Sequence, residues 1–129
     1  MARIHDVVFD SSHPAAIARF WAELLDGYQV APYDQAELDR LRGLGITDTE
    51  DDPSVLVEGP PGVWPRLFFQ LVPEPRSVKN RVHLDLKCAG AEAEADRAVR
   101  LGARVLETFD DHIMMADPEG NEFCLSYDR

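Results

Sequence analysis

The chain has 129 residues, enough for one domain and too few for two independent ones. Its 45% hydrophobic and 29% charged residues are ordinary for a globular protein and exclude a disordered or fibrous chain. The net charge of −11 repels phosphate backbones and anionic lipid, so we expect no nucleic-acid partner and no membrane-surface partner.

The first half of the chain predicts strands interleaved with two helices. Val7, Val8 and Phe9 are β-formers, and apolar residues then recur at helical spacing until Gly27 ends the pattern. The predicted elements are a strand over 4–10, a helix that ends at Gly27, a strand over 28–33, a short helix over 35–44, and strands over 54–58 and 66–72. The acidic stretch 48–52 between them predicts a solvated loop.

After Pro73-Glu74-Pro75 the pattern starts again. Residues 81–87 alternate strictly, with Leu84 and Leu86 on one face and His83 and Asp85 on the other. The remaining predicted elements are a helix over 92–101, closed by a glycine, and strands over 104–109, 113–116 and 122–127, the last two joined by the turn 117–121.

The chain therefore reads as β-α-β-β-β written twice. His5 opens the first copy and His83 the second, about 78 positions apart, and the two helix exits also correspond. A duplication of this period predicts two facing half-barrels rather than a solenoid. We predict a single domain, residues 1–129, made of module one over 1–75 and module two over 80–129.

Strand alternation predicts which side chains leave the helix-covered faces. Phe123 and Leu125 take the helix-facing positions of the last strand, which turns Glu122 and Cys124 the other way. Gln70 is turned the same way between Phe69 and Leu71. A one-residue slip in register would invert these assignments. A carboxylate buried on such a face would have a raised pKa and could act as an acid or base.

Cysteine use and the N-terminus predict the compartment. Cys88 and Cys124 form no CxxC motif, so we expect no disulfide framework. The sequence turns polar directly after Met1, and its apolar runs are too short for a signal peptide or a membrane span. We therefore expect a cytoplasmic protein.

Five stretches together resemble a known family. They are residues 5–10 leading to Phe20-Trp21, then 24–27, 68–74, 79–86 and the turn 117–123. In them the chain resembles the vicinal oxygen chelate superfamily, and within it the small glyoxalase-like proteins. The resemblance implies an α+β fold in which two tandem βαβββ modules form a curved mixed sheet around a cavity. It also implies a homodimer.

The resemblance also implies a metal site. Metal-using relatives hold a divalent cation with four side chains, and the matching positions here are His5, Gln70, His83 and Cys124. Such relatives usually have glutamate where Cys124 stands, and glutamate or a similar oxygen donor where Gln70 stands. Two imidazoles, an amide oxygen and a thiol form a mixed set with little negative charge, so we expect weaker metal binding than in true glyoxalases.

Two functions stay open at this point. In the first, an enzyme clamps two vicinal oxygens of a small metabolite on the metal, for lyase, isomerase or dioxygenase chemistry, with Glu122 as ligand or general base. In the second, a metal-free module sequesters or senses a planar compound, as bleomycin-resistance relatives do, with Phe68 and Trp64 as apolar walls and Asp85 as a further ligand-binding residue. Trp21 is a third aromatic candidate, but we expect it to pack inside the helix–sheet layer. A purely structural interaction domain would leave the polar faces of the strands unexplained. Against both stands the plain alternative that the histidines are hydrogen-bonded pocket residues and that Cys124 is a buried apolar side chain.

Overall fold

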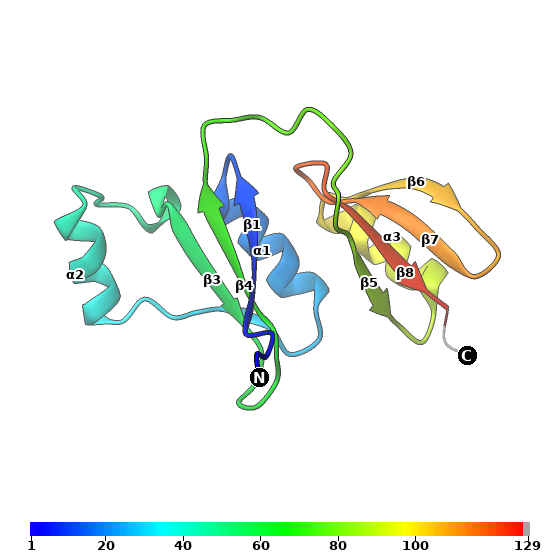
Figure 1. Cartoon of the computed structure of the whole chain (residues 1–129), viewed down its shortest axis with the longest axis horizontal. Helices are drawn as coiled ribbons and strands as arrows, with labels where there is room; N and C mark the ends of the chain where they lie inside the picture. The colour runs from blue at the N-terminus through cyan, green and yellow to red at the C-terminus, as the bar shows by residue number, and fades with distance from the viewer. Residues whose placement is uncertain (128–129) are drawn as a thin grey trace. The chain divides into compact units, whose positions relative to one another are not determined.

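The computed structural model describes residues 1–127 and divides after Pro75 into two compact units, which we call the first and second modules (Figure 1). Each module holds a four-stranded mixed sheet with one helix packed against it. The predicted α+β class with two tandem βαβββ modules is thereby confirmed. None of the helices in residues 1–127 is long and apolar enough to cross a membrane.

The first module has the sheet order β1-β4-β3-β2, in which β1 runs parallel to β4 and the other neighbours are antiparallel. Its elements are β1 (Asp6–Ser11), α1 (Pro14–Leu24), β2 (Gln29–Val30), α2 (Gln35–Gly43), the 3₁₀ turn η1 (Thr49–Asp51), β3 (Ser54–Glu58) and β4 (Arg66–Leu71).

Aromatic stacking between helix and sheet forms the core of the first module. The ring of Phe9 lies 5.8 Å from that of Trp21 on α1 and 5.2 Å from that of Phe69 on β4. Trp21 is 1% exposed, so it lies inside the helix–sheet layer as expected. Because Phe9 faces the helix, strand alternation turns Asp6, Val8 and Asp10 to the opposite face of the sheet.

The second module repeats this arrangement with the sheet order β5-β8-β7-β6. Its elements are β5 (Leu84–Lys87), α3 (Ala91–Leu101), β6 (Arg104–Thr108), β7 (His112–Ala116) and β8 (Glu122–Ser126). Small buried alanines of α3 let the helix approach the sheet closely, against fully buried Phe123 and Met115. The pairing of β6 with β7 shifts register between Val105 and Glu107, which makes β6 an irregular edge strand.

The strand registers show which residues of the first module correspond to which residues of the second. The helix-facing row formed by Phe9 and Phe69 in the first sheet corresponds to that formed by Leu86 and Leu125 in the second. Helix α1 begins at Pro14, five residues after Phe9, and α3 begins at Ala91, five residues after Leu86.

This register corrects the repeat alignment expected from sequence by one position. It matches Asp6, rather than His5, to His83, and Phe68 to Cys124. Val7, Val8 and Phe9 are all apolar, so the sequence alone does not show which of them face the helix and which face away from it.

Element positions differ from the sequence-based expectation mainly where a strand lacks a partner. Strand β5 begins at Leu84 rather than residue 81, because its ladder with β8 begins at the pair Leu84 and Phe123. Strand β2 is only two residues long and pairs only with β3. Strand β1 begins at Asp6 and not at residue 4. Helix α1 ends at Leu24, three residues before the predicted end at Gly27. The other predicted helix and strand ends fall within one residue of the observed ones.

The acidic stretch 48–52 is also not the wholly solvated loop that we expected. It contains η1, and Asp52 at its end is 2% exposed. The Asp52 carboxylate accepts hydrogen bonds from the Tyr33 hydroxyl at 2.7 Å, from the Arg40 guanidinium at 3.2 Å and from the Ser54 amide at 2.9 Å. A buried carboxylate needs such partners, and these connect α2 and β3.

Candidate functional site

The face of each sheet opposite its helix, which we call the open face, carries the predicted site residues that lie in strands. In the second module Asp85 of β5 and Cys124 of β8 are ladder partners, and Met114 of β7 is the next partner along. Ladder partners share a face, so these three side chains form one row across the sheet. Leu84 and Leu86 alternate with Asp85 and point to the helix-covered side.

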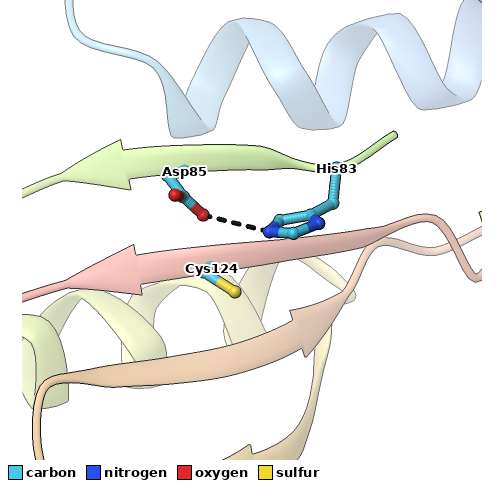
Figure 2. Close-up of side chains that lie close together, drawn as sticks. All are labelled: His83, Asp85 and Cys124. Carbon is cyan, nitrogen blue, oxygen red and sulfur yellow. Dashed lines mark ion pairs between the residues drawn. The ribbon is translucent and has the colours of Figure 1, made fainter. Parts of the chain in front are cut away.

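Three side chains of this face lie close together. One donor atom each from His83, Asp85 and Cys124 lies within 4.8 Å of the other two, and Figure 2 shows the histidine and aspartate converging over the cysteine. The His83 Nε2 atom lies 3.3 Å from the Asp85 Oδ1 atom. The side chains of His83 and Asp85 are 41% and 67% exposed, whereas Cys124 is 4% exposed. The cluster therefore has a buried thiol and two exposed donors.

Burial and the neighbouring Asp85 carboxylate favour the protonated form of the Cys124 thiol. Burial raises the pKa of Cys124, and the negative charge of Asp85 and a hydrogen bond to Asp85 raise this pKa further. Lys79 acts in the opposite direction and only partly offsets them. Cys124 is thus a protonated thiol at neutral pH, and it is a weak nucleophile in that state.

The donor types of this cluster fit a zinc ion. Imidazole nitrogen, carboxylate oxygen and cysteine sulfur are all zinc ligands, at about 2.0–2.3 Å from the metal. The three donor atoms already lie within 4.8 Å of one another. Three protein ligands would leave a fourth position open, which is the arrangement of catalytic rather than structural zinc sites.

Asp85 is the donor that sequence reasoning did not assign to the metal. It was predicted as a ligand-binding residue, whereas His83 and Cys124 were predicted as metal ligands. The His-x-Asp spacing already placed His83 and Asp85 on one face. The parallel register, which pairs Asp85 with Cys124, was the missing information. Asp85 therefore stands where it can supply the carboxylate that position 124 lacks.

Glu122, predicted as ligand or general base, has both carboxylate oxygens occupied. The Arg76 guanidinium pairs with its Oε1 atom, and the Asn80 backbone N–H donates to its Oε2 atom at 3.2 Å. Its side chain is 9% exposed. Glu122 is therefore engaged with the segment that precedes β5.

In the first module, His5 lies beside an ion pair. Its ring centroid is 4.6 Å from that of Trp64, and its Nδ1 atom is 3.0 Å from Asp6 Oδ1. Asp6 also accepts two hydrogen bonds from Arg66, at 2.8 and 3.1 Å, and its pKa is lowered chiefly by this pairing. Trp64 is 52% exposed.

Gln70 and Phe68 occupy other rows of the first open face. The Gln70 amide donates to Asp10 at 3.0 Å, so Gln70 and His5 have separate partners within this module. The Arg66 guanidinium lies 5.4 Å from the centre of the Phe68 ring, and Phe68 pairs with Val8. The predicted convergence of His5 and Gln70 with His83 and Cys124 involves both modules and stays a prediction.

A family model described as a glyoxalase-like domain matches residues 6–126. No curated protein matches the sequence.

Solved structures share the fold over nearly the whole chain. Fosfomycin resistance protein FosX from Mesorhizobium loti is similar with a TM-score of 0.69 at 12% identity, over 100% of this chain and 94% of that one. A glyoxalase/bleomycin resistance protein/dioxygenase family enzyme from Burkholderia phytofirmans PsJN gives 0.65 at 15% identity, over 98% of each chain. Glyoxalase I from Leishmania major gives 0.63 at 14% identity, over 98% of this chain and 87% of that one. At these identities the likeness shows the fold alone.

Proposed function

Because the chain belongs to the glyoxalase-like domain family of the vicinal oxygen chelate superfamily, we propose that it binds a small oxygenated organic molecule through a divalent metal on the open face of its second module. The proposed metal ligands are His83, Asp85 and Cys124. The proposed reaction is of the lyase, isomerase or dioxygenase class.

One observation carries this proposal: three different metal-binding groups lie within 4.8 Å of one another. Two of them are exposed, so a ligand can reach them from the open face. The His83 Nε2 atom lies 3.3 Å from the Asp85 Oδ1 atom, so the imidazole and the carboxylate lie side by side and both can turn toward one cation.

The chain's own residues would prepare this site in a defined way. His83 would contribute a neutral imidazole nitrogen, and Asp85 would contribute the negative charge that a neutral donor set lacks. Cys124 would have to lose its thiol proton, so loading is expected to release a proton and to weaken as the pH falls. A bound divalent metal would supply Lewis-acid stabilisation of negative charge on the vicinal oxygens of the substrate.

A second function is favoured by the first open face. Its central row consists of Val8, Phe68 and Leu56, all apolar, and the exposed ring of Trp64 lies beside the same strands. Such a surface suits a planar organic compound held without metal. The net charge of −11 favours a cationic compound of this kind.

Metal content tests the first function directly. We would measure metal by mass spectrometry in protein purified without chelators, and then zinc affinity by titration. His83→Ala, Asp85→Asn and Cys124→Ala should each weaken zinc binding by at least about tenfold. His13→Ala and Asp96→Asn are matched controls, because both residues are exposed and lie outside the cluster. Zinc titration of His5→Ala tests whether His5 is also a metal ligand, as the family resemblance implies.

The two functions give different results. Stoichiometric metal that the three site variants lose supports the first. Metal-free protein in which a screen of small planar compounds shifts only the Trp64 and Phe68 resonances supports the second. Metal-free protein with no response at either open face contradicts both.

A further inference from the structure

The backbone around His83 needs support from outside the sheet. His83 precedes β5, and the ladder between β5 and β8 begins one residue later, at Leu84 and Phe123. Residues 76–83 form no helix or strand. The position of the imidazole relative to Cys124 therefore depends on whatever holds this segment, which we call the entry segment.

Asn80 is the main contact between the entry segment and the start of β8. Its backbone N–H donates to Glu122 at 3.2 Å, and its side-chain amide donates to the Asn121 Oδ1 atom at 2.8 Å. Its own Oδ1 atom accepts from Arg76 at 2.8 Å. Arg76 then pairs with the second carboxylate oxygen of Glu122. Two residues of the entry segment are thus joined to Asn121 at the end of the turn and to Glu122 at the start of β8.

The sheet side of this contact is rigidly held. Asp117, 2% exposed, accepts hydrogen bonds from the Asn121 backbone N–H and from the Asn121 side-chain amide, both at 2.9 Å. The Asp117 N–H in turn donates to the Asn121 carbonyl at 2.9 Å. Glu122 is itself a ladder partner of Ala116. The turn and β8 are therefore held by their own hydrogen bonds, and they position the entry segment.

We infer that Glu122 and Asn80 are positioning residues that fix the entry segment and thereby hold His83 beside Asp85 and Cys124. Glu122 is suited to this role because a carboxylate with little exposure and a guanidinium partner forms charge-assisted hydrogen bonds. Both of its oxygens are used, so it is not free to act as a general base in this arrangement. The inference rests on the proposed role of His83 in the site.

NMR of the full chain tests this inference without any metal. Wild-type protein should give one sharp set of imidazole signals for His83. Asn80→Ala and Glu122→Gln should broaden or double these signals and should speed exchange of the backbone amide of residue 80, which donates to Glu122, by at least about tenfold. Arg76→Met should behave in the same way, whereas Arg76→Lys, which keeps a cationic donor, should restore much of the protection.

The control is Glu74→Gln, the same substitution at an exposed position just before the entry segment. It should leave both measurements unchanged. The inference is overturned if Asn80→Ala and Glu122→Gln lower the melting temperature but leave the His83 signals and the exchange of the residue 80 amide as in wild type. Absence of zinc binding in wild type would instead contradict the proposed function, and the NMR result would still decide the positioning role.

Discussion

The thiol of Cys124 illustrates how a neighbouring side chain sets reactivity. The sequence places a cysteine where metal-using relatives usually have a carboxylate, and the structure places a carboxylate, Asp85, directly beside it on the next strand. Burial is the largest cause of the raised thiol pKa, and Asp85 adds to it. The pKa of the Cys124 thiol is therefore coupled to the neighbouring carboxylate as well as to burial.

Alkylation kinetics should show this coupling. In a Cys88→Ser background, Cys124 should react slowly with iodoacetamide at pH 8, because little of the thiol is ionised and the side chain is 4% exposed. Asp85→Asn removes the neighbouring negative charge and so lowers the thiol pKa, which should shift the rate profile to lower pH. Asp96→Asn is the control, and an equal shift in both variants would contradict the coupling.

The ion pair between Asp6 and Arg66 should give the first module a distinct acid response. The folded-state pKa of Asp6 is lowered below its ordinary value of 3.8, mainly by the hydrogen bond from Arg66. Its contribution to stability is therefore complete above that value and is lost as the pH falls through the lowered folded-state pKa. We expect Asp6→Asn to cost about 1 kcal/mol at pH 7 and to flatten this part of the acid limb.

Urea unfolding between pH 2 and pH 7 measures this effect. Asp26→Asn, at an exposed position, should leave the acid limb as in wild type. An Asp6→Asn curve that runs parallel to the wild-type curve through the whole range would show that the pair contributes nothing.

At the scale of elements, alternation and helical spacing predicted most of the secondary structure. They predicted the bounds of β3, and they predicted that Cys124 lies on the face of its sheet opposite to Phe123 and Leu125, as the ladder register has it. Both β3 and β8 have strand partners on two sides. They failed for residues 81–83, which alternate correctly but have no partner strand. They also missed the burial of Asp52, because its acidic neighbours gave no sign of the long-range contact with Tyr33.

Asp52 should contribute more to the free energy of unfolding than any other residue of the acidic stretch 48–52. Its carboxylate joins Tyr33 before α2, Arg40 within α2 and the start of β3. Asp52→Ala leaves these donors without their acceptor, and we expect a loss of about 2–3 kcal/mol. Asp51→Ala, one residue earlier and exposed, should cost less than about 0.5 kcal/mol. Urea denaturation compares the two, and equal losses would contradict this assignment.

At the scale of the whole molecule, the duplicated pattern was enough to predict the fold class. The same pattern predicted that His83 and Cys124 share a face, because both lie in clearly alternating segments. It could not show that Asp85 pairs with Cys124, since register between strands distant in sequence leaves no local trace. The pattern also aligned His5 with His83, whereas the strand registers match Asp6 to His83. The first strand has apolar residues on both of its faces, so its sequence did not show the correct alignment.

The oligomeric state is a further prediction at this scale. The resemblance implies a homodimer, and open sheet edges are natural places for association. Sedimentation equilibrium at micromolar concentration should give about twice the chain mass of 14.5 kDa. A single species at the chain mass would contradict the prediction.

The register shift in β6 has a consequence for aggregation. An exposed edge strand with apolar residues such as Val105 and Leu106 would normally template the addition of a strand from another copy. Here the ladder is interrupted between Val105 and Glu107, and Arg104 and Glu107 add charge along the edge. A bulged, charged strand cannot present the regular row of donors and acceptors that fibril growth requires. We therefore expect this irregularity to disfavour edge-to-edge polymerisation at β6.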